Sequence, residues 1–219
     1  MTYTTDHKTG LDVRAHLIEQ GVETPFTPKK IDQTRLQVLF AELHREVGLD
    51  LADDSIAETP RRLAKLYSTQ EYFRGLDYAN FPKATVVDNK MGYDEMVVER
   101  NIIVNSLCEH HWLPIIGGAF VAYIPEKKVI GLSKLNRLVD FFCRRPQIQE
   151  RLVEQIYHAL SFLLETKNVA VVIEAEHMCV KTRGVEDACS DTVTSKLGGK
   201  FRDPALRAEF LTLAKGLRG

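Results

Sequence analysis

The sequence predicts an α+β fold in which an antiparallel sheet carries two helices on one face, preceded by an N-terminal helical extension. Two observations predict this fold. Apolar residues recur at helical spacing in two separate parts of the chain, and segments rich in Val, Ile, Tyr and Phe follow each part. The resulting order of helices, strands, a helix pair and strands again is typical of an α+β chain.

Two helices are predicted in the first third of the chain. Residues 32–47 carry apolar side chains every three or four positions, and a glycine follows as a stop signal. A second helix is predicted to begin at Thr59 and Pro60, because a capping residue followed by proline suits a helix start. Its continuation RRLAKLY carries Arg62 and Lys65 on one side.

Strands are predicted after the turn-rich segment GLDYANFPK, residues 75–83. The segments concerned are rich in β-branched and aromatic residues. They cover residues 84–88, 95–105, 118–124, 168–180 and 191–197. This change of character divides the chain. We expect residues 1–83 to form a helical extension with few contacts of its own and residues 84–219 to form the main domain.

The helix pair lies between these groups of strands. Ser133 is expected to cap a helix over residues 134–144, whose apolar residues fall at positions i, i+3, i+4 and i+7. Pro146 interrupts this helix. A longer helix follows, with one apolar face, and is expected to end near Lys167 and Asn168.

Composition and charge limit the classes of function. The chain has 219 residues, of which 44% are hydrophobic and 27% charged, and 29 basic side chains nearly balance 30 acidic ones for a net charge of −1. No overall field therefore attracts nucleic acid or an anionic membrane, and a polyanion must meet a local cluster. The start of the chain lacks the apolar core of a signal peptide, and no apolar run approaches the roughly 18 residues of a membrane span. We therefore expect a cytoplasmic protein.

A cluster of thiol and imidazole side chains predicts a metal site. Thiolate and imidazole are the usual ligands of zinc, and a catalytic site typically has three protein ligands with a fourth position for water. If residues 168–180 form a strand, two of the candidates point to the same face and serve one site. The candidates are Cys108, His110, His111, His177 and Cys179.

The stretch CEHH leaves two pairings open. An extended chain would pair Cys108 with His110, whereas a helical turn would pair Cys108 with His111. A Cys–His–Cys set lacks the fourth protein ligand of a closed site, which favours an open hydrolytic site over a structural zinc or unliganded polar residues.

The remaining cysteines and Glu109 add little to this set. Four cysteines are too few and too scattered for a disulfide framework in a chain of this length. Cys143 and Cys189 are interpreted as buried or incidental thiols. Glu109 has the chemistry of a general base beside zinc ligands, as in the zinc nucleobase deaminases, but their PCxxC signature is missing.

Basic residues at a predicted helix start form a candidate anion site. Backbone N–H groups and the helix dipole favour an anion beside Ser133, and Lys134 and Arg137 are three residues apart on one side. Phosphate is the natural ligand of such a cluster, although a lone basic residue more often belongs to a solvated face. Arg183 follows Cys179 closely enough to lie near the same metal. A second basic pair is Arg62 with Lys65.

Gln149 and Glu150 in RRPQIQER are ambiguous from sequence. A QxxER pattern on a helix is normally a surface pattern. A carboxylate there has, however, the chemistry to accept hydrogen bonds from the N1–H and the exocyclic amine of a guanine.

Seven stretches, in order, resemble the bacterial GTP cyclohydrolase I family over nearly the whole chain. They are LADDSIAETPRR, GLDYANFPK, CEHHWLPI, AYIP, VIGLSKLNRLV, RRPQIQERL and EHMCVKTRG. CEHH, GLSKLNR and RPQxQERL are specific together, although no one of them is specific alone. Only the first thirty residues look freely variable.

The resemblance implies hydrolysis of GTP to formate and 7,8-dihydroneopterin triphosphate, the first step toward folate-type pterins. It implies a zinc ion bound by Cys108, His111 and Cys179. It assigns catalysis to His110 and His177, and contact with the guanine edge to Gln149 and Glu150. The later proton transfers of the reaction also suit the hydroxyl of Ser133. The triphosphate would contact Ser133, Lys134, Arg137 and Arg183, with Arg62 and Lys65 completing that pocket.

The resemblance also implies a fold and an assembly. The family has the tunnelling fold, so residues 84–219 would be a tunnelling-fold catalytic domain. Antiparallel sheets from five subunits would close a barrel, and two pentamers would stack as a homodecamer. The active sites would then lie between subunits.

The expected chemistry fits these residues. Zinc lowers the pKa of a bound water to about 7, which supplies a nucleophile for C8 of guanine. His177 is expected to protonate N7, without which C8 is a poor electrophile. One alternative is a non-catalytic nucleotide-binding regulatory protein with a structural zinc. Another is a tunnelling-fold reductase acting on a pterin-like or deazaguanine base, which should need a nicotinamide cofactor and no CEHH set.

Overall fold

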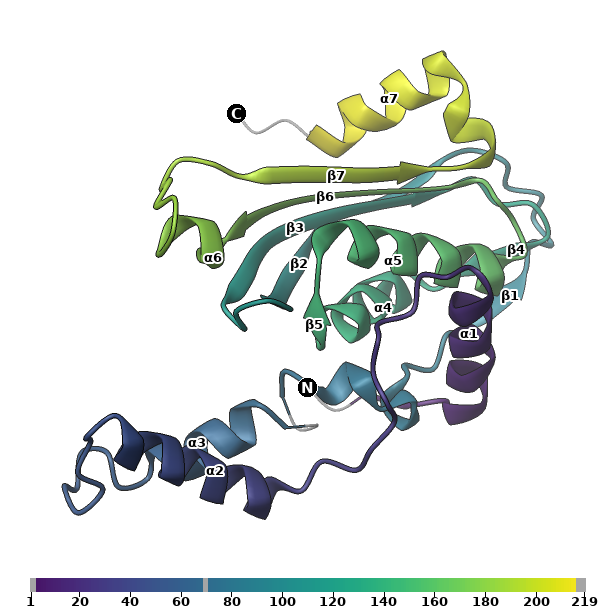
Figure 1. Cartoon of the computed structure of the whole chain (residues 1–219). Helices are drawn as coiled ribbons and strands as arrows, with labels where there is room; N and C mark the ends of the chain where they lie inside the picture. The colour runs from purple at the N-terminus through teal and green to yellow at the C-terminus, as the bar shows by residue number, and fades with distance from the viewer. Residues whose placement is uncertain (1–2, 69–70, 216–219) are drawn as a thin grey trace.

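A five-stranded sheet with the strand order β5-β2-β3-β6-β7 forms the centre of the protein (Figure 1). The computed structural model describes residues 3–68 and 71–215. The long strands are antiparallel to their neighbours, and β5 runs parallel to the end of β2. The sheet consists of β2 (Val97–Cys108), β3 (Pro114–Tyr123), β5 (Pro146–Gln147), β6 (Val169–His177) and β7 (Thr192–Leu197). A separate ribbon pairs β1 (Val86–Asp88) with β4 (Lys128–Ile130).

Two helices cover one face of the sheet, as the sequence predicts. They are α4 (Leu132–Cys143) and α5 (Gln149–Leu164). In β2 the buried Ile102 and Val104 alternate with the exposed Asn101 and Ile103, because successive side chains of a strand point to opposite faces. The inward set joins the apolar faces of both helices in one core. The α+β class is therefore confirmed.

The opposite face of the sheet is partly covered by the C-terminal segment. A 3₁₀ helix, η3 (Gly199–Arg202), leads into α7 (Pro204–Lys215), and the buried Phe201 and Phe210 pack with strand residues in a second core. This helix was not predicted from the sequence.

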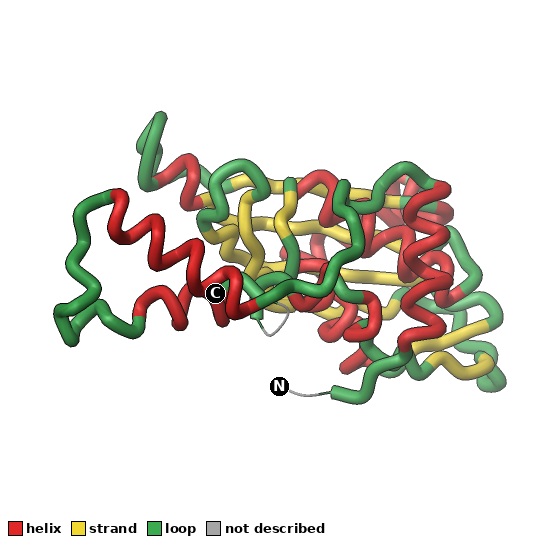
Figure 2. The backbone as a smooth tube through the Cα atoms, turned by 60° about the horizontal axis from the view of Figure 1, so that its bottom comes forward, coloured by secondary structure: helices red, strands yellow, loops and turns green. Residues whose placement is uncertain are grey.

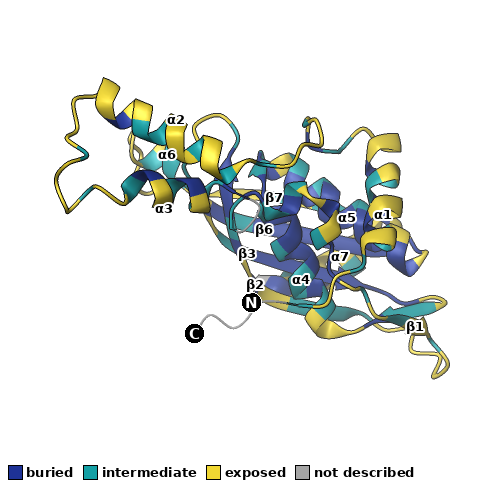
Figure 3. Cartoon of the chain, turned by 90° about the horizontal axis from the view of Figure 1, so that it is seen from below, coloured by how far each residue is buried: buried dark blue, intermediate teal, exposed yellow. Residues whose placement is uncertain are grey.

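The N-terminal region consists of two parts, a helix packed on the main core and a pair of helices that projects from it. Helix α1 (His7–Glu19) starts at Asp6, whose side chain accepts from the Thr9 amide, and it was not predicted. Its Val13 and Leu17 are fully buried in the main core, so the expectation of few contacts is wrong for this helix. The predicted helices α2 (Gln33–Glu46) and α3 (Thr59–Leu66) instead pack on each other and project beyond one end of the sheet, largely exposed (Figures 2 and 3).

Two local predictions need correction. Strand β6 ends at His177, and α6 (Met178–Lys181) replaces the last residues of the strand predicted over 168–180. Helix α4 begins at Leu132 with Gly131 as its N-cap, so Ser133 lies inside the first turn and does not cap it. The turn-rich segment contains two 3₁₀ helices, η1 (Arg74–Leu76) and η2 (Tyr78–Asn80). Within the described residues, no helix has the length and apolar character to cross a membrane.

Candidate metal centre

The CEHH stretch forms the tight turn that joins β2 to β3. The Cys108 amide donates to the Leu113 carbonyl at 2.8 Å, and the Trp112 amide donates to the Cys108 carbonyl at 2.9 Å. Trp112 closes the turn with a φ of 55°, in the left-handed region that non-glycine residues seldom adopt. The chain therefore turns as a helix would, which brings His111 back toward Cys108.

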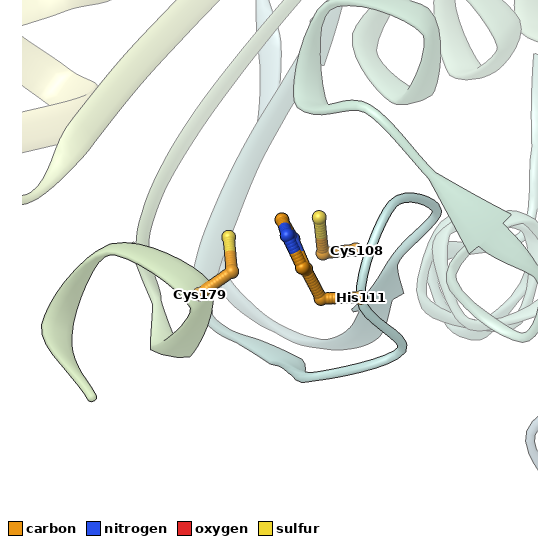
Figure 4. A group of neighbouring side chains, drawn as sticks. All are labelled: Cys108, His111 and Cys179. Carbon is orange, nitrogen blue, oxygen red and sulfur yellow. The ribbon is translucent and has the colours of Figure 1, made fainter. Parts of the chain in front are cut away.

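Three donor atoms converge at this turn. One ligand atom each of Cys108, His111 and Cys179 lies within 4.8 Å of the other two. Cys108 ends β2, His111 lies in the turn and Cys179 comes from α6, and the three side chains point toward one another (Figure 4). The pairing of Ile115 with His177 in the sheet places the turn beside α6. These are the three zinc ligands that the family resemblance implies.

The electrostatics of the two thiols favour a bound cation. Burial raises the pKa of the Cys179 thiol, and the neighbouring Cys108 raises it further, whereas Arg183 lowers it. Two thiolates held this close repel each other, and a cation between them removes that penalty. Two thiolates and one imidazole are zinc-type ligands, so these residues fit zinc. By contrast, burial raises the pKa of Cys143 to about 12, which keeps it a neutral core thiol.

His177 lies next to this group without belonging to it. Its Nε2 lies 2.7 Å from Oε1 of Gln149, the first residue of α5. Burial lowers the pKa of His177, and the charge of Glu150 opposes that effect. The expectation that His177 and Cys179 share a strand face is wrong, because the strand ends between them.

His110 and Glu109 have partners that the sequence did not indicate. His110 Nδ1 lies 3.7 Å from Cys108 Sγ, and its Nε2 lies 3.8 Å from Glu109 Oε1. Arg151 of α5 donates from NH1 to Glu109 Oε2 at 2.5 Å, in a pair whose side chains are only 17% and 23% exposed. Arg151 therefore ties the turn to the helix that also carries Gln149.

Arg183 lies at the rim of the metal group, as predicted from its place after Cys179. Its NH1 donates to His111 Nε2 at 2.6 Å. The guanidinium is exposed and so remains accessible to an anion. A positive charge directly beside the metal ligands suits a substrate that carries phosphate.

The basic residues at the start of α4 lie at the opposite end of the sheet from the metal group. Lys134 follows β4, at the end of the sheet where Tyr123 pairs with Val169, whereas the metal group lies at the end where Ile115 pairs with His177 (Figure 1). At about 3.4 Å per residue, β3 separates these two ends by roughly 30 Å. One chain alone therefore does not bring the first turn of α4, Ser133 included, to the metal.

Arg137, one turn further along α4, lines a separate groove of about 600 Å³. Its guanidinium lies 5.5 Å from the ring centre of Tyr3, and Arg74 and Arg144 line the same groove. Asp140 pairs with both of these arginines. The groove keeps an excess of positive charge, which suits an anionic ligand.

The basic pair on α3 approaches the metal turn through aromatic contacts. Arg62 and Lys65 are exposed, and Lys65 lies 3.6 Å from Glu71. Tyr67, which caps α3, packs on Trp112 with ring centres 5.3 Å apart. Trp112 and Arg151 are thus the site residues that sequence reasoning missed. The whole-chain pattern CEHHW…QER contained both, but only their tertiary contacts reveal their roles.

The fold and the site together define a class of protein. The chain is an α+β protein with a three-donor thiolate and imidazole set at one end of an antiparallel sheet, the ligand number typical of catalytic zinc sites. The family model for GTP cyclohydrolase I matches residues 36–215.

Curated relatives give the same result. The chain is 54% identical over 208 residues to GTP cyclohydrolase 1 of Shewanella baltica (strain OS185), covering 93% of this chain and 96% of the relative. It is 55% identical over 210 residues to GTP cyclohydrolase 1 of Shewanella denitrificans, covering 94% and 96%. The chain belongs to the GTP cyclohydrolase I family and is an enzyme of this type.

Proposed function

We propose that the protein hydrolyses GTP to formate and 7,8-dihydroneopterin triphosphate, the first step of a pterin or folate pathway. The observation that carries this proposal is the convergence of Cys108, His111 and Cys179 in a chain of this family. We further propose zinc as the cofactor. Zinc held by these residues would supply a water of pKa about 7 and hence a nucleophile for C8 of guanine.

The side chains around the metal group would carry out proton transfer and bind the guanine base. His177 would donate a proton to N7 of guanine, and His110 would carry protons during ring opening, ribose rearrangement and closure. Ser133, as a hydroxyl, is a further candidate for those transfers. Glu150 is exposed, its charge acts on His177, and it would accept hydrogen bonds from the guanine edge.

The basic residues would hold the triphosphate and thereby place C8 at the metal. Arg183 is supported by its contact with His111. Lys134 and Arg137 would have to come from another copy of the chain, because they lie far from the metal within one copy. Arg62 and Lys65 would complete the pocket.

Three surfaces support a homodecamer with the tunnelling fold. In the described chain β7 pairs only with β6, and β2 pairs with β5 only at its last two residues, so both sheet edges are open. Open edges accept another strand, and five sheets joined in this way would close a barrel. Helix α2 exposes apolar side chains that would suit the stacking of two pentamers. They are Val38, Leu39, Leu43 and Val47.

The same edges support active sites between subunits. Helix α4 lies along β2, with Asn136 Nδ2 donating to Glu99 Oε1 at 2.9 Å. The metal group spans the end of β2 and the residues after β6, and β6 is the neighbour of the edge strand β7. A β7-to-β2 junction would bring the part of the metal group that follows β6 toward α4 of the next subunit. The division at residue 83 and the cytoplasmic location remain predictions.

Incubation with GTP tests the proposed function. We expect formate and the absorbance of a dihydropterin to appear together, and both to stop when the metal is removed and to return with zinc. A non-catalytic nucleotide-binding protein with a structural zinc would bind GTP without either product. Full activity in a rigorously metal-free preparation would contradict the hydrolytic mechanism.

A further inference from the structure

The side-chain amide of Gln149 is wholly engaged inside the chain. Gln149 is only 1% exposed, although it is the first residue of α5. Its Nε2 donates to the Ile173 carbonyl at 3.0 Å, the Thr192 carbonyl at 2.9 Å and Thr194 Oγ1 at 3.1 Å. The two hydrogens of this amide nitrogen are therefore shared among three acceptors.

This environment fixes which way the amide points. Turning it over would place Oε1 against the carbonyl oxygens of Ile173 and Thr192, which is repulsive because neither partner carries a hydrogen. Nε2 must therefore face β6 and β7, and Oε1 must face His177 Nε2, 2.7 Å away. The orientation of the amide thus follows from the acceptors around it.

The fixed amide in turn fixes the state of the His177 ring. Oε1 of an amide only accepts, so His177 Nε2 must carry a hydrogen, whether the ring is neutral or charged. Nδ1 has no hydrogen-bond partner among the described residues, and it is the nitrogen left for a substrate. The acceptors that hold Gln149 lie on adjacent paired positions, since Ile173 pairs with Thr194 and Ala175 with Thr192.

We propose that Gln149 is a positioning residue for His177 and does not contact guanine. Gln149 would hold the His177 ring at the junction of α5, β6 and β7. The Nε2–H of His177 would donate to Gln149, and Nδ1 would face the substrate. This inference rests on the proposed function and gives Gln149 a different role from the one that the family resemblance implies. A guanine contact by Nε2 would require the amide to give up at least one of these three acceptors.

A double-mutant cycle tests the proposal. Gln149→Leu should lower kcat for formate release by about 10- to 100-fold, the usual effect of losing a group that orients an active residue, with the affinity for GTP unchanged. In a His177→Ala background, Gln149→Leu should lower the residual single-turnover rate no further, because its partner is already gone. GTP affinity is measured by calorimetry on the His177→Ala proteins.

Two further variants keep the test decisive. Thr194→Val removes one acceptor of the Gln149 amide without touching His177, and should lower kcat less than Gln149→Leu does, again only when His177 is present. Gln155→Leu is the matched control: Gln155 is fully buried on the same helix, and its Nε2 donates to the Val22 carbonyl and Thr24 Oγ1. It should leave kcat per folded protein unchanged.

The proposal is overturned if Gln149→Leu weakens GTP binding, or if its effect on the rate is the same with and without His177. It is also overturned if Thr194→Val and Gln149→Leu both leave kcat unchanged. Failure of the proposed function is visible separately, because the unsubstituted protein would then release no formate from GTP.

Discussion

The metal group depends on one thiol that comes from a different element from the other two ligands. Cys108 and His111 belong to one turn, whereas Cys179 is carried by the short helix α6. We therefore expect Cys179→Ser to lose bound zinc and formate release together, because a hydroxyl is a much weaker zinc ligand than a thiolate. Elemental analysis and a formate assay on the same preparation measure both.

The exposed Cys189 provides the control for this substitution. It lies outside the metal group, and Cys189→Ser should keep the full zinc content and rate. A Cys179→Ser protein that retains stoichiometric zinc would show that α6 does not supply a ligand.

Arg183 is predicted to act on phosphate and not on the base. Its guanidinium is exposed and touches the metal ligand His111, so it can meet the substrate at the rim of the site. Arg183→Ala should weaken binding of GTP by about 10-fold or more, the loss of one charge-assisted contact of roughly 1.5–3 kcal/mol, and should change guanosine binding little. Titrations with both ligands measure the difference.

An exposed arginine on α7 serves as the comparison for Arg183. Arg207→Ala removes the same charge far from the metal group and should leave both affinities unchanged. Equal losses of GTP and guanosine binding in Arg183→Ala would mean that the guanidinium does not contact phosphate.

At the scale of elements, the turn and α5 are linked by one ion pair. Glu109 and Arg151 are partly buried. Glu109 directly follows the metal ligand Cys108 in the turn. Arg151→Ala should weaken zinc retention by about 10- to 100-fold, the usual cost of losing a group that orients metal ligands. The rate at which a chelator removes zinc measures it.

The charge-swapped protein separates pairing from a general loss of structure. Glu109→Arg combined with Arg151→Glu should retain zinc better than either single substitution, because the swap restores an attractive pair. If the double variant loses zinc as fast as the sum of the singles predicts, the pair does not orient the turn.

Element prediction succeeded where local pattern and tertiary environment agree. The helix pair and most of the sheet follow from apolar periodicity and β-branched content, and the buried faces of α4 and α5 are the predicted ones. Strand β6 was extended too far because HMCV reads as strand by composition, whereas the chain must bend there to bring Cys179 to the metal group. The sequence does not predict helix α1, because its moderate apolar pattern, with Val13 and Leu17, is buried only by tertiary contacts with α5 and η2.

The sequence predicts which residues form the candidate site better than it predicts how they are arranged in space. The family resemblance favours His111 over His110, and the turn geometry explains the choice: the bond from the Trp112 amide to the Cys108 carbonyl closes one helical turn, and the left-handed Trp112 ends it. The roles of Arg151 and Gln149 depend on contacts between residues tens of positions apart, which spacing along the chain does not reveal.

At the scale of the whole molecule, the proposed site is divided between two ends of the sheet. The metal group lies at one end, and the first turn of α4 with Lys134 lies at the other, roughly 30 Å away by the length of β3. If neighbouring subunits complete each site, a defect in one half should be complemented by a different chain that is intact in that half. Subunit mixing can test this directly.

We predict that Cys179→Ser and Lys134→Ala proteins, each nearly inactive alone, regain activity when they are denatured and refolded together. Random mixing in equal amounts would give about one quarter of the unsubstituted rate, because half of the chains supply an intact metal group and half supply an intact α4. Formate release measures the recovery. Mixing Cys179→Ser with His111→Ala should give none, since both lack the same half. Absence of recovery in the first mixture, with oligomers present, would mean that each site is built within one chain, and α4 would then have to reach the metal by a rearrangement of the subunit.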